Sequence, residues 1–139
     1  MIAEHTLIKF GFTKDEDNLK LKKVFKDSIK LKEVHIDIYP ENPLAYTMSS
    51  FMLLLRVVEK KVIVSNNGDR LIIKKNVDKY ETHFMNVLFS KITECYYKIC
   101  SGYFEFIINI QNIYYKITGD IDTENTVVEE NTSNESESE

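Results

Sequence analysis

Residues 61–75 decide most of the fold, with two apolar runs on either side of an Asn-Gly pair: Lys61-Val62-Ile63-Val64-Ser65, Asn66-Asn67-Gly68-Asp69 and Arg70-Leu71-Ile72-Ile73-Lys74-Lys75. Asn-Gly between such runs is the strongest short-range hairpin signal, because both central residues of a type I′ turn need positive φ. We therefore predict an antiparallel hairpin of strands 61–65 and 70–75.

Alternating apolar residues predict further strands on both sides of this hairpin. Residues 34–39 alternate cleanly and end at Pro40, and residues 41–49 are expected to form a loop. The apolar run 50–58 predicts a central strand with both faces covered. Residues 103–110 alternate again, and Gln111-Asn112 is expected to turn into a strand at 113–118, whose exposed edge offers a place for a second copy to pair.

Residues 18–32 fit two interpretations. As strands, they alternate leucine with lysine, turn at Lys26-Asp27-Ser28, and need a bulge where the parity slips between Leu31 and Val34. As a helix, they place Leu21, Val24, Phe25 and Ser28 at positions i, i+3, i+4 and i+7. We favour the strand interpretation.

Residues 78–101 predict the one long helix. Asp78 and Glu81 have the spacing of a capping box, and Gly102 supplies a C-terminal stop. Apolar residues recur there every three or four positions: Val77, Tyr80, Phe84, Leu88, Ile92, Cys95 and Ile99. Residues 2–10 predict a short N-terminal helix. The expected fold is α+β, with a mostly antiparallel sheet of five to seven strands packed by helix 78–101.

The charge is divided between the body of the chain and its end. The chain has 139 residues and a formal net charge of -4. Eight of its 22 acidic residues and none of its 18 basic ones lie in 120–139, which leaves a net +4 in residues 1–119. Residues 131–139 are only Asn, Thr, Ser and Glu and cannot bury an apolar face. We predict one globular domain at 1–119 and a disordered acidic tail at 120–139.

Several sequence features favour a cytoplasmic, reducing location. No signal-peptide pattern opens the chain, and the longest apolar run is far shorter than the roughly 20 residues of a membrane span. We therefore expect no membrane partner. Cys95 and Cys100 fall five positions apart in the predicted helix, where their side chains diverge, so we expect free thiols and a packing role for both.

The sequence carries no recognisable catalytic, metal or nucleotide motif. Its four glycines form no phosphate-binding loop, and the serines at 49 and 50 lack a nucleophile-elbow setting. His35, Asp37 and His83 are candidates for a metal or acid–base site, but their spacing matches no zinc pattern and a solvent-facing position explains them better. We expect no cofactor, no metal and no enzymatic activity.

The remaining candidates are surfaces. A basic run has the charge to contact phosphates, and several tyrosines have rings able to stack on bases. The candidate lysines are Lys20, Lys22, Lys23, Lys26, Lys30 and Lys32, and the candidate tyrosines are Tyr96, Tyr97, Tyr103, Tyr114 and Tyr115. A solvated basic face and rings that fill the core are the plainer interpretations of the two sets.

We expect a non-catalytic interaction protein, a small adaptor or inhibitor that acts through protein–protein contacts. Its compactness and its richness in Lys, Ile and Asn, typical of AT-rich genomes, suit a viral or mobile-element accessory protein that blocks a host factor. The alternative is a nucleic-acid-binding module whose basic body is modulated by the acidic C-terminal tail. Homo-oligomers fit either hypothesis.

Overall fold

The computed structural model describes residues 11–43, 53–77 and 80–122. Strands run through these residues in the order β1 (Thr13–Lys14), β2 (Ile29–Tyr39), β3 (Leu55–Asn67), β4 (Arg70–Val77), β5 (Tyr80–Leu88), β6 (Ile92–Cys100), β7 (Tyr103–Ile110) and β8 (Ile113–Ile121). A 12-residue helical segment precedes β2 and consists of η1 (Glu16–Asn18), α2 (Leu19–Val24) and η2 (Phe25–Asp27). The single turn η4 (Phe89–Lys91) joins β5 to β6.

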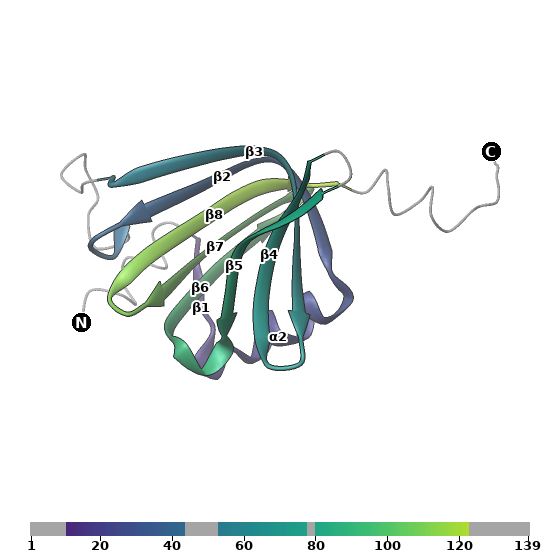
Figure 1. The fold of residues 1–139 in the computed structure, drawn as a ribbon. Helices are drawn as coiled ribbons and strands as arrows, with labels where there is room; N and C mark the ends of the chain where they lie inside the picture. Colours follow the sequence, from purple (N-terminus) through teal and green to yellow (C-terminus); the bar gives the residue numbers. More distant parts are fainter. Residues whose placement is uncertain (1–10, 44–52, 78–79, 123–139) are drawn as a thin grey trace.

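The strands form one open sheet in the order β1-β6-β7-β8-β2-β3-β4-β5, and every neighbouring pair is antiparallel. Figure 1 shows the sheet strongly curved, with α2 at one end of the curve. The fold is thus α+β and mainly β. The predicted class and antiparallel sheet are confirmed, but the sheet has eight strands rather than five to seven.

The predicted hairpin is β3–β4, and its turn differs in detail from the expected one. Asn67 pairs with Arg70, so the two turn residues are Gly68 and Asp69. Gly68 has φ +69, and Asp69 is not among the residues with positive φ. Positive φ at the first position alone is the requirement of a type II′ turn. The second predicted turn is confirmed, with positive φ at both Gln111 and Asn112 between β7 and β8.

The strand interpretation of residues 18–28 is wrong, because this segment is helical. Leu21 and Phe25 point into the core at 1% and 0% exposure, and Val24 packs beside them. The Asp15 carboxylate accepts hydrogen bonds from the backbone N–H groups of Lys20 and Leu21, at 2.8 and 2.9 Å. These bonds satisfy two donors that a helix start leaves unpaired. The apolar residues at helical spacing pack on the core, and this segment therefore forms a helix rather than strands.

The long helix predicted at 78–101 is also wrong. The described part of this stretch forms β5, η4 and β6, with residues 78–79 outside the description. A spacing of four places residues on one face of a helix and equally on one face of a strand. The spacing of Tyr80, Phe84 and Leu88 therefore could not distinguish the two. Ser101-Gly102, expected as a helix stop, instead turns β6 into β7.

The predicted parity slip between Leu31 and Val34 is confirmed. The register between β2 and β8 shifts there, and Glu33 has φ +53. Gly119 of β8 lies against this bend, where an added Cβ would meet Val34 Cγ2 at 3.1 Å and Leu31 Cβ at 3.2 Å. A side chain at Gly119 would therefore require its neighbours on β2 to shift by a few tenths of an ångström, so the glycine allows β2 and β8 to approach closely at the bend.

Other expectations fall partly or wholly outside the description. Helix 2–10 and loop residues 44–49 are not described, nor are residues 123–139 of the predicted tail. The predicted division at 119/120 stays a prediction, although Asp120 and Ile121 belong to β8 and Asp122 is buried. The strand expected to be covered on both faces begins at Leu55, which is 54% exposed. The edge expected at 113–118 is wrong, because β8 lies between β7 and β2.

The main core lies inside the curve of the sheet. Its buried members come from α2, η2, η4 and all the long strands except β5: Leu21, Phe25, Leu31, Val34, Ile36, Val62, Val64, Leu71, Ile73, Phe89, Ile92, Cys95, Phe104, Phe106, Ile108 and Ile117. Phe25 contacts Phe104 and Phe106, with ring centroids 5.6 and 5.3 Å apart. A smaller cluster of Phe12, Tyr96 and Ile107, with Tyr114 against it, is separate from this core. The helical segment is thus anchored by aromatic packing on the inner face.

Candidate functional site

The structure divides the predicted lysine run into two groups. Lys20, Lys22 and Lys23 belong to α2 and Lys26 to η2, whereas Lys30 and Lys32 belong to β2. Ser28, with φ +58, separates the helical group from the strand group. We call Lys30 and Lys32 the strand lysines. The two groups have different surroundings, although only a few residues separate them in sequence.

One face of the helical segment forms a wall of a shallow surface groove of about 490 Å³. Leu19, Lys22, Lys23 and Lys26 line this wall at positions i, i+3, i+4 and i+7, which share one side of a helix. The side chains facing the core, Leu21 and Phe25, lie on the opposite side. Lys20 does not line the groove. The other wall is the β3–β4 turn, through Asn66, Gly68 and Asp69. We call this site the lysine groove.

Asn66 holds the two walls of the lysine groove together. Its Nδ2 donates to the backbone oxygen of Lys22 at 3.0 Å, which ties the hairpin to the helix. Its Oδ1 is buried without a hydrogen-bond partner in the described part of the chain. Sequence reasoning used the Asn-Asn-Gly stretch only as a turn signal and so missed this wall.

The groove lysines are poorly neutralised. Within the described residues, no carboxylate oxygen lies within 4.0 Å of the ammonium groups of Lys23 or Lys26. The Lys22 ammonium lies 5.7 Å from the centre of the Phe89 ring, a cation–π contact. The groove therefore carries three lysines against the one carboxylate of Asp69, which leaves it with a net positive charge.

The strand lysines have acidic neighbours. Lys32 lies opposite Lys61 on one side and opposite Asp120 on the other. The Lys61 ammonium lies 3.9 Å from the Asp122 carboxylate. The backbone N–H of Asp122 donates to the backbone oxygen of Lys30. Asp120 at the end of β8 and Asp122 just after it therefore bring two acids beside this part of the basic run and offset part of its charge.

The predicted tyrosines do not join the lysines. Tyr96 is 1% exposed, and its hydroxyl donates to Glu94 at 2.6 Å, while Tyr114 donates to the other oxygen of the same carboxylate. Tyr103 donates to Glu105 at 3.1 Å. Tyr97 and Tyr115 pack against the main core. None of the five lines the lysine groove, so the expected combination of basic and stacking groups is not assembled there.

The tyrosine–carboxylate contacts shift several pKa values. Burial raises the pKa of Glu94, but hydrogen bonds from Tyr114, Tyr96 and Asn109 outweigh burial and hold that pKa below its usual value. Burial and the bond to Glu94 raise the pKa of Tyr114 to about 12. Burial and Glu105 raise the pKa of Tyr103 to about 12. A general acid or base works best with a pKa near the operating pH, and these shifts move away from neutrality.

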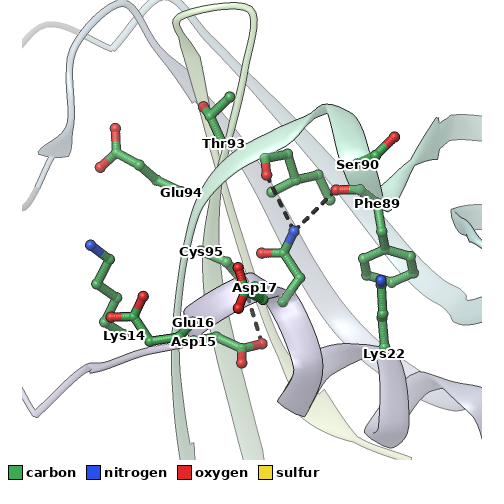
Figure 2. Close-up of a pocket in the computed structure, with 12 residues that line it drawn as sticks. Lys14, Asp15, Glu16, Asp17, Lys22, Phe89, Ser90, Thr93, Glu94 and Cys95 are labelled. Carbon is green, nitrogen blue, oxygen red and sulfur yellow. Dashed lines mark hydrogen bonds between the residues drawn. The ribbon is translucent and has the colours of Figure 1, made fainter.

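A polar cavity of about 290 Å³ lies where the helical segment meets β6, as Figure 2 shows. Its main polar groups have structural partners. Asp15 caps α2, and the Asn18 side chain donates to the backbone oxygens of Phe89 and Ile92 at 3.0 and 3.2 Å. Burial and the nearby Asp15 carboxylate raise the pKa of the Cys95 thiol, which disfavours the reactive thiolate. The cavity is therefore best explained as a joint between helix and sheet.

The predicted His35, Asp37 and His83 set is not brought together. β2 and β5 are separated in the sheet by β3 and β4. Arg56 binds both oxygens of Asp37, at 2.8 and 2.9 Å, while both histidines are exposed. Across the described ranges, no group of three His, Cys, Asp or Glu side chains has metal-binding geometry.

The two cysteines are free thiols, as predicted, but they lie on a strand rather than a helix. Residues five apart on a strand point to opposite faces. Cys95 is accordingly buried in the core, as expected, whereas Cys100 is exposed, so a packing role for it is wrong.

Comparison with known proteins finds no family model, curated sequence or solved structure that matches this chain. In residues 11–43, 53–77 and 80–122, no helix has the length and apolar character needed to cross a membrane.

Proposed function

We propose that the protein is a non-catalytic binding protein whose lysine groove takes an acidic segment of a protein partner. The observation that carries this proposal is the shared helical face of Leu19, Lys22, Lys23 and Lys26, which is positive and lines a groove. A protein that acts by occupying its partner needs no catalytic group. The role that follows is that of a small adaptor or inhibitor in a reducing cytoplasm.

The arrangement of the lysines favours an anionic ligand. Lys22 and Lys23 lie four and three positions before Lys26, and like charges at these spacings destabilise a helix by a few tenths of a kcal/mol per pair. The helix dipole favours Lys22 and Lys23 in the last turn of α2 and offsets part of this repulsion. A bound carboxylate would offset the rest.

The apolar rim favours a peptide over a nucleic acid. Leu19 is 64% exposed beside the lysines. Proteins that bind single-stranded nucleic acid add aromatic stacking to a basic groove. The candidate tyrosines lie elsewhere, so the groove offers charge and an aliphatic contact without a stacking platform. An acidic segment with one apolar side chain matches both features.

The proposal is tested by fluorescence anisotropy with the full chain at low salt. Three labelled probes are titrated: an oligoglutamate with one central leucine, an oligoglutamate without it, and single-stranded DNA of equal charge. We expect the leucine-containing peptide to bind most tightly. The double variant Lys23→Gln/Lys26→Gln should weaken that binding by about ten-fold, because each exposed charge pair contributes up to about 1 kcal/mol.

The matched control is Lys30→Gln/Lys32→Gln, which removes the same charge from the strand lysines and should change peptide affinity by less than about two-fold. Tighter binding of DNA than of either peptide would replace the proposal with the nucleic-acid alternative. Failure of all three probes to bind would refute both. Equal losses in the two double variants would show that net charge, rather than the groove, drives binding.

A further inference from the structure

The first half of β3 is an open edge of the sheet. β3 pairs with β2 from Leu55 to Val64, but β4 pairs with β3 only from Ile63 to Asn67. On the side away from β2, residues 55–62 are therefore paired with no strand of the described chain, although the Lys75 side chain of β4 reaches Glu59. Figure 1 shows β3 as the outermost strand over this length. Its outward backbone groups are available for pairing with another strand.

This edge combines charged side chains, which usually protect a sheet edge, with exposed apolar side chains. Proteins blunt an edge with charged side chains, prolines or very short strands. Here Leu55 is 54% and Val58 is 61% exposed, and Leu53 and Leu54 just before the strand are 40% and 54% exposed. By contrast, the edge strand β1 has only two residues.

Most charges along the open edge are already paired within the chain. Arg56 binds Asp37, the Glu59 carboxylate lies 2.9 Å from the Lys75 ammonium, and Lys61 contacts Asp122. The edge therefore presents apolar side chains between internally balanced charges. Such a surface suits an apolar strand with the same balance rather than a strongly charged ligand.

We propose that this edge pairs with the same edge of a second copy of the chain, in an antiparallel, two-fold symmetric arrangement. An isologous interface brings the same patch of both subunits together. Directly opposite residues of antiparallel strands point to the same face of the sheet. The two-fold axis therefore passes midway between the two copies of one residue, so this residue of one subunit lies opposite the same residue of the other.

The charges, together with the start of β3 at Leu55, select Val57 as the residue on the axis. An axis at Arg56 places Arg56 opposite itself, and an axis at Val58 places Arg56 opposite Lys60. Like charges directly opposite each other are destabilising. Axes at Leu55 and at Val57 both avoid these clashes, but an axis at Leu55, the first residue of β3, would place the strand opposite residues that precede it. With the axis at Val57, Arg56 faces Val58 and Lys60 faces Leu54. The aliphatic stems of these basic residues cover the apolar side chains opposite them.

The register predicts that a positive and a negative side chain at position 58 have opposite effects on the dimer. In the dimer, residue 58 of each copy faces Arg56 of the other. Val58→Lys creates two like-charge pairs and should raise the dimer dissociation constant by about ten-fold. Val58→Glu places opposite charges there and should leave that constant unchanged or lower it. Residue 58 is exposed, so both variants should fold, which circular dichroism checks.

Sedimentation equilibrium of the full chain over a range of concentrations gives the dissociation constants. A concentration-dependent dimer, weakened by V58K and not by V58E, supports the proposal. A protein that stays monomeric at every concentration overturns it. Equal weakening by both variants also overturns it, because an apolar patch without this register would lose affinity in both cases.

Cross-linking provides a second readout of the register. In a Cys100→Ser background, which removes the exposed native thiol, V57C should form an intermolecular disulfide across the axis under oxidising conditions. V58C should not, because its copies are diagonal neighbours about 7–8 Å apart, beyond the reach of a disulfide. The reverse result would exclude the Val57 axis.

Discussion

The lysine groove and the strand lysines come from one basic run, and the fold gives them different surroundings. Lys23 and Lys26 lie on a helix whose opposite face fills the core, so their ammonium groups face a groove. Lys30 and Lys32 lie on a strand whose neighbour β8 carries Asp120 near its end and is followed by Asp122. Charge density in the sequence is therefore a poor guide to charge density on the surface. The partners supplied by the fold decide which lysines remain available.

The largest predicted effect comes from removing the aromatic ring that anchors the helical segment to the core. Phe25→Ala deletes a fully buried ring that packs on Phe104 and Phe106. Large-to-small changes of this kind cost about 3–5 kcal/mol. We expect a loss of that size in the free energy of urea unfolding. Leu19→Ala on the same segment is the control, and since Leu19 is exposed, a comparable loss there would contradict the packing account.

The next largest loss of stability is expected at the bend where β2 and β8 approach each other. Gly119→Ala places a methyl group against Val34 and Leu31, and forced overpacking costs about 1–3 kcal/mol. Gly119→Val should destabilise the fold further, because the side chain is larger. The urea midpoint measures both variants. Full stability in the valine variant would show that the close approach of β2 and β8 is unnecessary.

A third change tests whether the hydrogen bonds to Glu94 affect stability without affecting the lysine groove. Because the folded pKa of Glu94 lies below the ordinary value of 4.5, its ionised form stabilises the fold fully above 4.5. This contribution is lost as the pH falls through the lowered folded pKa. Glu94→Gln should therefore reduce the fall in unfolding free energy between pH 7 and pH 3, while peptide binding at pH 7 stays unchanged.

The exposed Glu16→Gln variant is the control for the acid measurement, since Glu16 is not part of this network. A fall in unfolding free energy as steep in Glu94→Gln as in the wild type would contradict the assignment of this pH dependence to Glu94.

The smallest predicted effect comes from removing an acid beside the strand lysines, which makes their surroundings more like those of the lysine groove. Asp120→Asn removes the exposed acid opposite Lys32. Exposed charge pairs contribute little, so stability should change by less than about 0.5 kcal/mol. Affinity for the acidic peptide should rise by no more than about two-fold. A gain as large as the loss in Lys23→Gln/Lys26→Gln would mean that the two lysine groups are equivalent.

The sequence predicted the fold best where a local rule has a single solution. The hairpin, the turn at Gln111-Asn112 and the parity slip before Val34 each follow from short-range geometry, and all three are present. Residues 80–100 were misassigned because their apolar spacing suits both a helix and a strand, and the turn at η4 shifts the alternation between β5 and β6. Pairing with neighbouring strands, which the pattern does not encode, decided between the two structures.

The candidate site was only half predictable. The lysines were visible as a cluster, but their division depends on the helix ending before Ser28. The opposite wall comes from Asn66 and the β3–β4 turn, tens of residues later in the chain. The tyrosines were candidates either for a contact surface or for the core, and Glu94 and Glu105 hold three of them in hydrogen bonds. Such pairings arise only from strand register.

A charge swap in the groove tests whether Lys23 and Lys26 decide the preference for an acidic ligand. The variant Lys23→Glu/Lys26→Glu is titrated with the leucine-containing oligoglutamate and with an oligolysine of the same length that carries one leucine. We predict that the variant loses the acidic peptide and binds the basic one, whereas the same swap at Lys30 and Lys32 leaves the original preference in place. Retained affinity for the acidic peptide in the groove swap, or an equal reversal by the strand swap, would contradict the account.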